Sequence, residues 1–74
     1  MTKLPRLKGQ ELIATLRKAD FEVIRIKGSH HFLHHYDGRC VVVPIHSGET
    51  IGPGLMSRIL RDCKMSYDEL IELL

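Results

Sequence analysis

The chain has 74 residues, of which 43% are hydrophobic and 27% are charged, and this length fits a single domain over residues 1–74. Its two cysteines are too few for a disulfide framework and lack the spacing of a zinc site. No apolar run is long enough to span a bilayer, and the N-terminus has no apolar signal core. We therefore expect a small cytoplasmic α+β domain rather than a secreted, membrane-spanning or zinc-dependent protein.

Charge is unevenly distributed along the chain, although the formal net charge is only +2. Residues 1–46 carry eight Lys or Arg against four Asp or Glu, whereas residues 47–74 carry three against five. Such an asymmetry permits a surface that faces a polyanion, but a merely solvated surface explains these charges more simply. Charge alone therefore does not indicate a partner.

The first half of the chain predicts one helix and three strands. Residues 1–8, which contain Pro5 and three positive charges, are expected to form an extended arm. From Gly9 onward, apolar residues recur at helical spacing. Asp37-Gly38 is typical of a two-residue hairpin turn between strands. Segments with β-branched or alternating apolar residues predict the strands, which cover residues 21–27, 30–36 and 40–44.

The second half predicts two helices. Pro53 suits the first position of a helix with Gly52 as its cap. Ser66 and Glu69 form the sequence pattern of a capping box, which predicts a short terminal helix. The predicted order is therefore α-β-β-β-α with a short extra helix at the C-terminal end. Apolar residues at helical spacing should form the buried side of the first of these helices: Leu55, Met56, Ile59, Leu60 and Cys63.

Four of the five histidines occur in the run HHFLHH over residues 30–35. In a helix, two pairs of histidines four residues apart could chelate a metal ion. In a strand, the same residues lie about 13 Å apart, which is too far for shared ligation. Glycine and serine before the run and Asp37-Gly38 after it favour a strand, so we expect no metal site. Alternation alone leaves open whether Phe32 or Leu33 faces the core.

The sequence Arg-Ile-Lys-Gly-Ser-His-His over residues 25–31 resembles a motif of the HicA toxins, which are small mRNA interferases of bacterial toxin–antitoxin pairs. This resemblance implies a fold similar to the double-stranded-RNA-binding domain, with a three-stranded antiparallel sheet and helices on one face. The chain departs from the family at Lys8 and Lys64, where a Ser or Thr cap and a helix-closing Gly are common. Further matching segments cover nearly the whole chain in order: DGR at 37–39, VP at 43–44, HSG at 46–48 and GPGLMSRILR at 52–61.

The resemblance also implies a site. The family's catalytic histidine directly follows Gly-Ser, which makes it His30 here, and Leu33 is then expected to face the core. The implied activity is a metal-independent endoribonuclease without a cofactor, which cleaves mRNA by attack of the ribose 2′-hydroxyl on its own phosphodiester. His30 would act as general acid or base in this reaction. The expected RNA-binding residues lie around it: Arg25, Lys27, Gly28 and Ser29.

Besides the RNA substrate, the resemblance implies a HicB-type antitoxin that binds the toxin and covers its site. Two alternatives are a non-catalytic RNA-binding module of the same topology and a structural fragment stabilised by a partner. His34 and His46 are both candidates for a second proton-transfer group. Phe32 and Tyr36 are candidates for base stacking, although packing or simple exposure explains either aromatic ring more simply.

Overall fold

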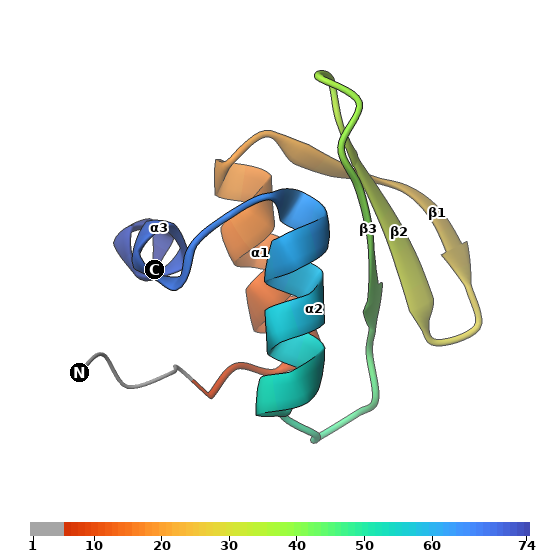
Figure 1. The fold of residues 1–74 in the computed structure, drawn as a ribbon. Coiled ribbons are helices and arrows are strands. Elements are labelled where there is room, and N and C mark those ends of the chain that lie inside the picture. Colours follow the sequence, from red (N-terminus) through yellow and green to blue (C-terminus); the bar gives the residue numbers. More distant parts are fainter. Residues whose placement is uncertain (1–5) are drawn as a thin grey trace.

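The computed structural model describes residues 6–74 and has the predicted order of one helix, three strands and two helices (Figure 1). The architecture is therefore the α+β layout α-β-β-β-α with a short additional helix. Within residues 6–74, no helix is long and apolar enough to cross a membrane. The elements are α1 (Gly9–Lys18), β1 (Phe21–Lys27), β2 (His30–His35), β3 (Cys40–Pro44), α2 (Pro53–Cys63) and α3 (Tyr67–Leu73).

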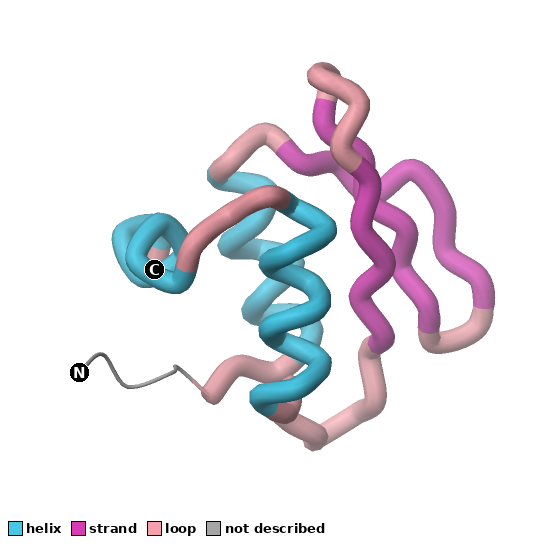
Figure 2. Tube along the Cα trace, viewed as in Figure 1, coloured by secondary structure: helices cyan, strands magenta, loops and turns pink. Residues whose placement is uncertain are grey.

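The three strands form one antiparallel sheet with β2 in the centre. The helices lie on one side of this sheet, as the tube view shows (Figure 2). Side chains alternate between the two faces of a strand, and Leu33 in β2 is only 1% exposed because it points toward the helices. The inward position expected for Leu33 is therefore confirmed. Phe32 points to the opposite side, which we call the open face.

The core lies between the sheet and the helices. α1 contributes Leu12 and Leu16, and α3 contributes Leu70, all of them fully buried. The amphipathic patterns in the sequence predict these positions because each helix has one apolar stripe to bury. Within residues 6–74, the buried hydrophobic residues are Leu7, Leu12, Ile13, Leu16, Phe21, Leu33, Val41, Val43, Ile51, Met56, Ile59, Leu60, Cys63 and Leu70.

The expected arm over residues 1–8 lies partly outside the described residues, which begin at Arg6. The described end of this segment is extended but joins the fold. Leu7 is buried in the core, and its carbonyl oxygen accepts a hydrogen bond of 2.7 Å from the backbone N–H of Ile51. Lys8 then forms an isolated β-bridge with Thr50 and caps α1. The chain just before α1 is therefore held by the segment that precedes α2.

One of the two hairpin turns agrees with the prediction, and the other differs in length. Gly28-Ser29 forms the two-residue turn, because Lys27 pairs directly with His30. Gly28 has a φ of +60°, as the first central position of a type II′ turn requires. The turn at Asp37-Gly38 is longer than the two residues expected: the N–H of His35 donates to the carbonyl of Arg39, so three residues form the loop. The site of this turn was predicted correctly and its length was wrong.

The C-terminal helices follow the predicted bounds closely. Leu55 is the exception in the apolar stripe of α2, since its side chain is 36% exposed rather than buried. The capping box is confirmed: the N–H of Glu69 donates to Oγ of Ser66, and the N–H of Ser66 donates to Oε1 of Glu69. Lys64 ends α2 in the left-handed region at φ +53°, a conformation that costs a non-glycine residue about 1 kcal/mol or more.

Candidate nucleic-acid cleavage site

His30 is the first residue of β2 and lies at one end of the sheet. Its neighbours across the sheet are Lys27 on β1 and Pro44 on β3. The side chain is exposed on the open face. Within residues 6–74, the histidine rings that take part in hydrogen bonds are those of His31 and His35, and His30 is not among them. The imidazole of His30 is therefore accessible and has both ring nitrogens available to a ligand.

The turn before His30 is tied to the strand beyond it. The carbonyl oxygen of Ser29 accepts a hydrogen bond of 2.7 Å from the N–H of Ile45, and Nδ1 of His31 lies 3.3 Å from the same oxygen. The positive φ of Gly28 sets the tight reversal between the strands. Gly28 and Ser29 therefore fix the backbone conformation just before His30. The Ser29 hydroxyl donates no hydrogen bond to any described residue.

An irregularity in β1 decides which face its cations occupy. Phe21 and Val23 lie on the helix side of the sheet, so strict alternation would place Arg25 there as well. The register shifts between Val23 and Arg25, and this bulge reverses the alternation. As a result, Arg25 pairs with Phe32, and Lys27 pairs with His30. The bulge therefore brings the basic residues of β1 to the face that carries the imidazole.

A groove runs from His30 to helix α2, which packs against β3. Its volume is about 400 Å³, within the range of ligand sites. Arg58 of α2 lines this groove together with His30, although it is not among the residues that the sequence predicts for the site. The remaining lining residues are Phe32, Val42, Pro44, Leu55, Ile59 and Asp62.

The cations around the groove are not neutralised by carboxylates. Both ion pairs among residues 6–74 involve Asp37, at the other end of β2. Lys27, Arg25 and Arg58 therefore have no carboxylate partner in that part of the chain. The guanidinium of Arg25 lies 5.9 Å from the centroid of the Phe32 ring, a cation–π contact that leaves its charge in place. Unpaired cations beside an accessible imidazole suit an anionic ligand such as a phosphodiester.

The two histidines considered as second proton-transfer groups lie in different places. His34 is on the same face of β2 as His30 but four residues further on, about 13 Å away, and it lines a separate hollow with Arg17 and Glu22. His46 is exposed and follows Pro44, the cross-strand neighbour of His30. The sheet therefore separates His34 from the groove. His46 lies in the loop beyond that end of β3 and lines another hollow with Lys8 and Gly9.

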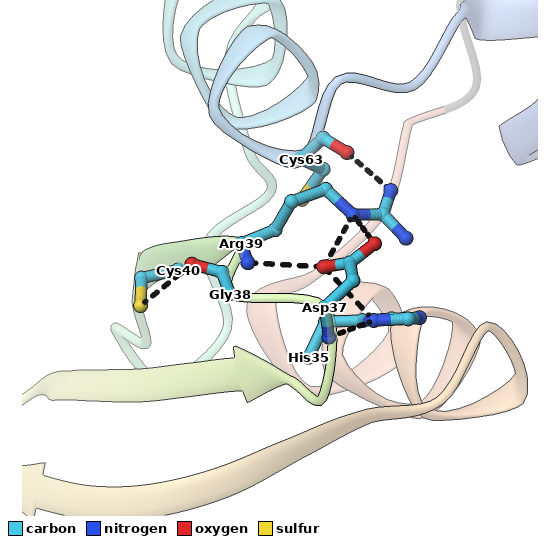
Figure 3. A network of polar contacts seen from close by, with 6 residues as sticks. All are labelled: His35, Asp37, Gly38, Arg39, Cys40 and Cys63. Atoms are coloured by element: carbon cyan, nitrogen blue, oxygen red, sulfur yellow. Dashed lines mark hydrogen bonds and ion pairs between the residues drawn. The ribbon is translucent and has the colours of Figure 1, made fainter.

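At the far end of β2, His35 belongs to a polar network that closes the hairpin (Figure 3). Nδ1 of this buried histidine lies 3.0 Å from Oδ1 of Asp37 and 3.1 Å from the backbone nitrogen of the same residue. Arg39 donates from Nε to Oδ2 of Asp37 at 2.8 Å and from Nη1 to the carbonyl of Cys63 at 2.6 Å. The network thus ties the β2–β3 turn to the end of α2.

These contacts shift the pKa of two groups near the turn. The pKa of Asp37 is lowered from 3.8, chiefly because the backbone N–H of Arg39 donates to the carboxylate and the guanidinium of the same residue adds to the effect. Burial raises the pKa of the Cys63 thiol to about 11, so this sulfur stays protonated and is a poor nucleophile. Neither group is close to His30 in the fold, and we assign both to structure.

Among residues 6–74, no three His, Cys, Asp or Glu side chains lie close enough together to hold a metal ion. The histidines of the HHFLHH run lie in strand β2, so two histidines four residues apart are too distant to share a metal ion. The side chains that the open face does bring together are one imidazole and the surrounding cations, which can exchange a proton and bind a phosphate. Proton transfer with charge stabilisation is the chemistry available to this set of residues.

Comparison with known protein families identifies the family of this chain. Residues 9–65, well over half of the chain, match the family model described as HicA toxin of bacterial toxin–antitoxin. The matched range includes β1, the Gly28-Ser29 turn, His30 and all of α2. A comparison with curated proteins found no match. The chain therefore belongs to the HicA toxin family of bacterial toxin–antitoxin systems, and this membership implies an antitoxin as its partner.

Proposed function

We propose that this toxin is a metal-independent endoribonuclease that cleaves mRNA and that His30 is its catalytic residue. The observation that carries the proposal is the accessible imidazole of His30 beside unpaired cations, in a chain of the HicA family. A buried or hydrogen-bonded ring at this position would have opposed it. An exposed histidine near neutral pH is able to accept or donate a proton, which is what cleavage of RNA by its own 2′-hydroxyl needs.

In the proposed reaction, neutral His30 removes the proton of a ribose 2′-hydroxyl. The 2′-oxygen forms a bond to the adjacent phosphorus as the bond from phosphorus to the 5′-oxygen breaks. The products are a 2′,3′-cyclic phosphate and a 5′-hydroxyl, once the departing oxygen has taken up a proton. Lys27 and Arg58 would stabilise the negative charge that builds up on the phosphoryl oxygens. The Gly28-Ser29 turn would hold the phosphate close to the backbone and to the Ser29 hydroxyl.

The proton for the departing 5′-oxygen needs a source. Of the two candidates, position favours His46 over His34, because His34 lies about 13 Å from His30 along β2. His46 lies two residues beyond Pro44, the last residue of β3 and the cross-strand neighbour of His30. We therefore expect His46→Ala to lower the cleavage rate and His34→Ala to leave it nearly unchanged. Equal losses in both variants would contradict this assignment.

The decisive experiment compares wild-type protein, His30→Ala and His34→Ala on a defined RNA with EDTA present throughout. His34 is a matched control because it lies on the same strand and the same face but lines a different hollow. His30→Ala should lower the cleavage rate by roughly 10²-fold or more. Retained activity in His30→Ala would remove this residue from the mechanism, and loss of wild-type activity in EDTA would contradict metal independence. Salt-sensitive RNA binding without new 5′-hydroxyl ends would favour a non-catalytic RNA-binding module instead.

We further propose that the antitoxin is of the HicB type and covers this groove. Large apolar side chains are exposed around it: Ile24 is 62% exposed, Val42 38% and Leu55 36%. Apolar side chains grouped at one surface are typical of a protein interface. The purified antitoxin should therefore abolish cleavage at a near-equimolar ratio. Undiminished cleavage in a stable toxin–antitoxin complex would contradict direct coverage of the site.

A further inference from the structure

The proposed chemistry involves His30 and the cations beside it, and it assigns no role to the apolar part of the groove. Phe32 of β2 and Val42 of β3 lie directly opposite each other and form its apolar floor, and Leu55 of α2 lies at its wall. A second, shallower hollow of about 200 Å³ continues over the same two floor residues. Asp62 of α2 lines both hollows, so a carboxylate stands beside the apolar floor throughout.

The floor fits a planar ring. Phe32 is half-buried, and the guanidinium carbon of Arg25 lies 5.9 Å from the centroid of its ring. Nucleobases stack favourably on such aromatic side chains, whatever the base. Phe32 is two residues from His30 on the same face of β2, about 7 Å along the strand. A base on this floor would therefore belong to a nucleotide that adjoins the phosphate at His30.

Asp62 has the chemistry to choose which base is held there. Its carboxylate is exposed and forms no ion pair with any residue in 6–74, although Arg58 is one helical turn away. An ionised carboxylate only accepts hydrogen bonds, and it binds most strongly to two parallel N–H groups. Guanine is the one standard base whose Watson–Crick edge has two adjacent N–H donors, on N1 and on the 2-amino group. Adenine, cytosine and uracil each offer fewer donors to a carboxylate.

We propose that this part of the groove is a guanine subsite, in which the base stacks on Phe32 and Val42 and Asp62 accepts its N1–H and 2-amino hydrogens. The subsite rests on the proposed ribonuclease function, because it positions a nucleotide next to the bond that His30 would cleave. Phosphate contacts by Lys27 and Arg58 hold any RNA, whereas this contact depends on the base. Asp62 is therefore a specificity residue rather than a catalytic one.

The test is first a binding experiment that needs no cleavage. Full-length protein is titrated into labelled 2′-O-methyl uridine oligonucleotides with one central guanine, hypoxanthine or adenine, and fluorescence anisotropy gives Kd. The wild type should bind the guanine oligonucleotide about tenfold more tightly than the adenine one, with hypoxanthine between them because it lacks the 2-amino group. Asp62→Asn should bring the ratio close to one. Glu72→Gln, which removes one exposed charge from α3, should leave the ratio unchanged.

Mapping of cut positions on a mixed-sequence RNA then separates this inference from the proposed function. Wild-type cuts should be enriched for guanine at one fixed position next to the cleaved bond, and Asp62→Asn should lose that enrichment. Equal binding of all three oligonucleotides, or an unchanged ratio in Asp62→Asn, would overturn the guanine subsite while leaving the ribonuclease intact. Guanine-selective binding without any cleavage would overturn the ribonuclease and retain a base-specific RNA-binding groove.

Discussion

The two ends of β2 carry the same kind of side chain in opposite surroundings. His30 at the first position is exposed on the open face, beside cations that have no carboxylate partner within residues 6–74. His35 at the last position is 5% exposed, stacks edge-on against Phe21 at 5.2 Å and has Asp37 at its Nδ1. The imidazole of His30 is accessible to a ligand, whereas that of His35 is held within the structure.

The difference shows that the strand, not the residue type, sets the role of each histidine. His30 and His35 are five positions apart in the strand, an odd number, so the two rings point to opposite faces of the sheet. Only one of those faces is covered by helices (Figure 1). The run of histidines in β2 therefore contains both accessible and buried members, and substitutions at the two ends should have separable effects.

The largest expected effect is the one on chemistry at the exposed end. His30→Ala should lower RNA cleavage by roughly 10²-fold or more and change the free energy of unfolding by less than about 0.5 kcal/mol, since the ring makes no buried contact. Cleavage assays and urea denaturation of the same preparation measure both quantities. A large stability loss in His30→Ala would break the comparison.

The next effect is on stability at the buried end. His35→Ala should lower the free energy of unfolding by about 2 kcal/mol, because it leaves a cavity beside Phe21 and removes the partner of Asp37. The cleavage rate of the folded fraction should stay close to that of wild type. Urea denaturation followed by circular dichroism gives the stability. A cleavage defect as large as that of His30→Ala, in protein that is still folded, would show that the two ends are not independent.

A smaller effect concerns the cations that surround the exposed end. Arg58→Ala should weaken binding of single-stranded RNA about tenfold and reduce the slope of log K against log salt concentration by about 0.7. Arg61→Ala is the matched control, because this exposed arginine lies on the same helix and is not among the residues that line the groove. Binding isotherms at several salt concentrations measure both. The same slope change in both variants would mean that the helix acts through its general charge.

A substitution at Lys64 probes the end of β2 that carries the buried His35 without changing a histidine. Lys64 follows Cys63, whose carbonyl accepts the hydrogen bond from Arg39, and it adopts a φ of +53°. Lys64→Gly should raise the free energy of unfolding by about 1 kcal/mol, because glycine adopts this conformation without strain. The thermal midpoint should rise, and the cleavage rate at the other end of the molecule should stay the same. A decrease in stability would show that the Lys64 side chain contributes contacts.

The smallest effect is a pH dependence at Asp37. Its pKa is lowered from 3.8 in the folded state, so the unfolded chain binds a proton at this carboxylate at a higher pH than the folded chain does. The stability that the carboxylate contributes is present above pH 3.8 and is lost as the pH falls through the lower, folded value. Asp37→Asn should therefore show a shallower loss of stability between pH 5 and pH 3 than wild type. Glu72→Gln is the control, and an identical pH profile in both variants would contradict the role of the network.

Much of the fold followed from local sequence signals. The strand bounds at Phe21–Lys27 and Cys40–Pro44, and the capping box of α3, were predicted correctly because neighbouring residues determine them. The Asp37-Gly38 turn was predicted to be two residues long and is longer. The pairing of β2 with β3 determines where the two strands separate, and hence the length of the loop. The expectation that Leu55 would be buried was wrong, since helix α2 turns that edge of its apolar stripe into the groove.

Sequence by itself determined the order of elements, the residues that must be buried and the Gly-Ser-His step that marks the proposed site. These properties depend on hydrophobic periodicity and turn chemistry, which act over a few residues. Tertiary structure alone decided that Arg25 and Lys27 share a face with His30, because a bulge in β1 shifts the strand by one residue. Tertiary structure also brought Arg58 and Asp62, about 30 residues further along the chain, to the groove of His30. Their position depends on the packing of α2 against β3, which local sequence patterns do not specify.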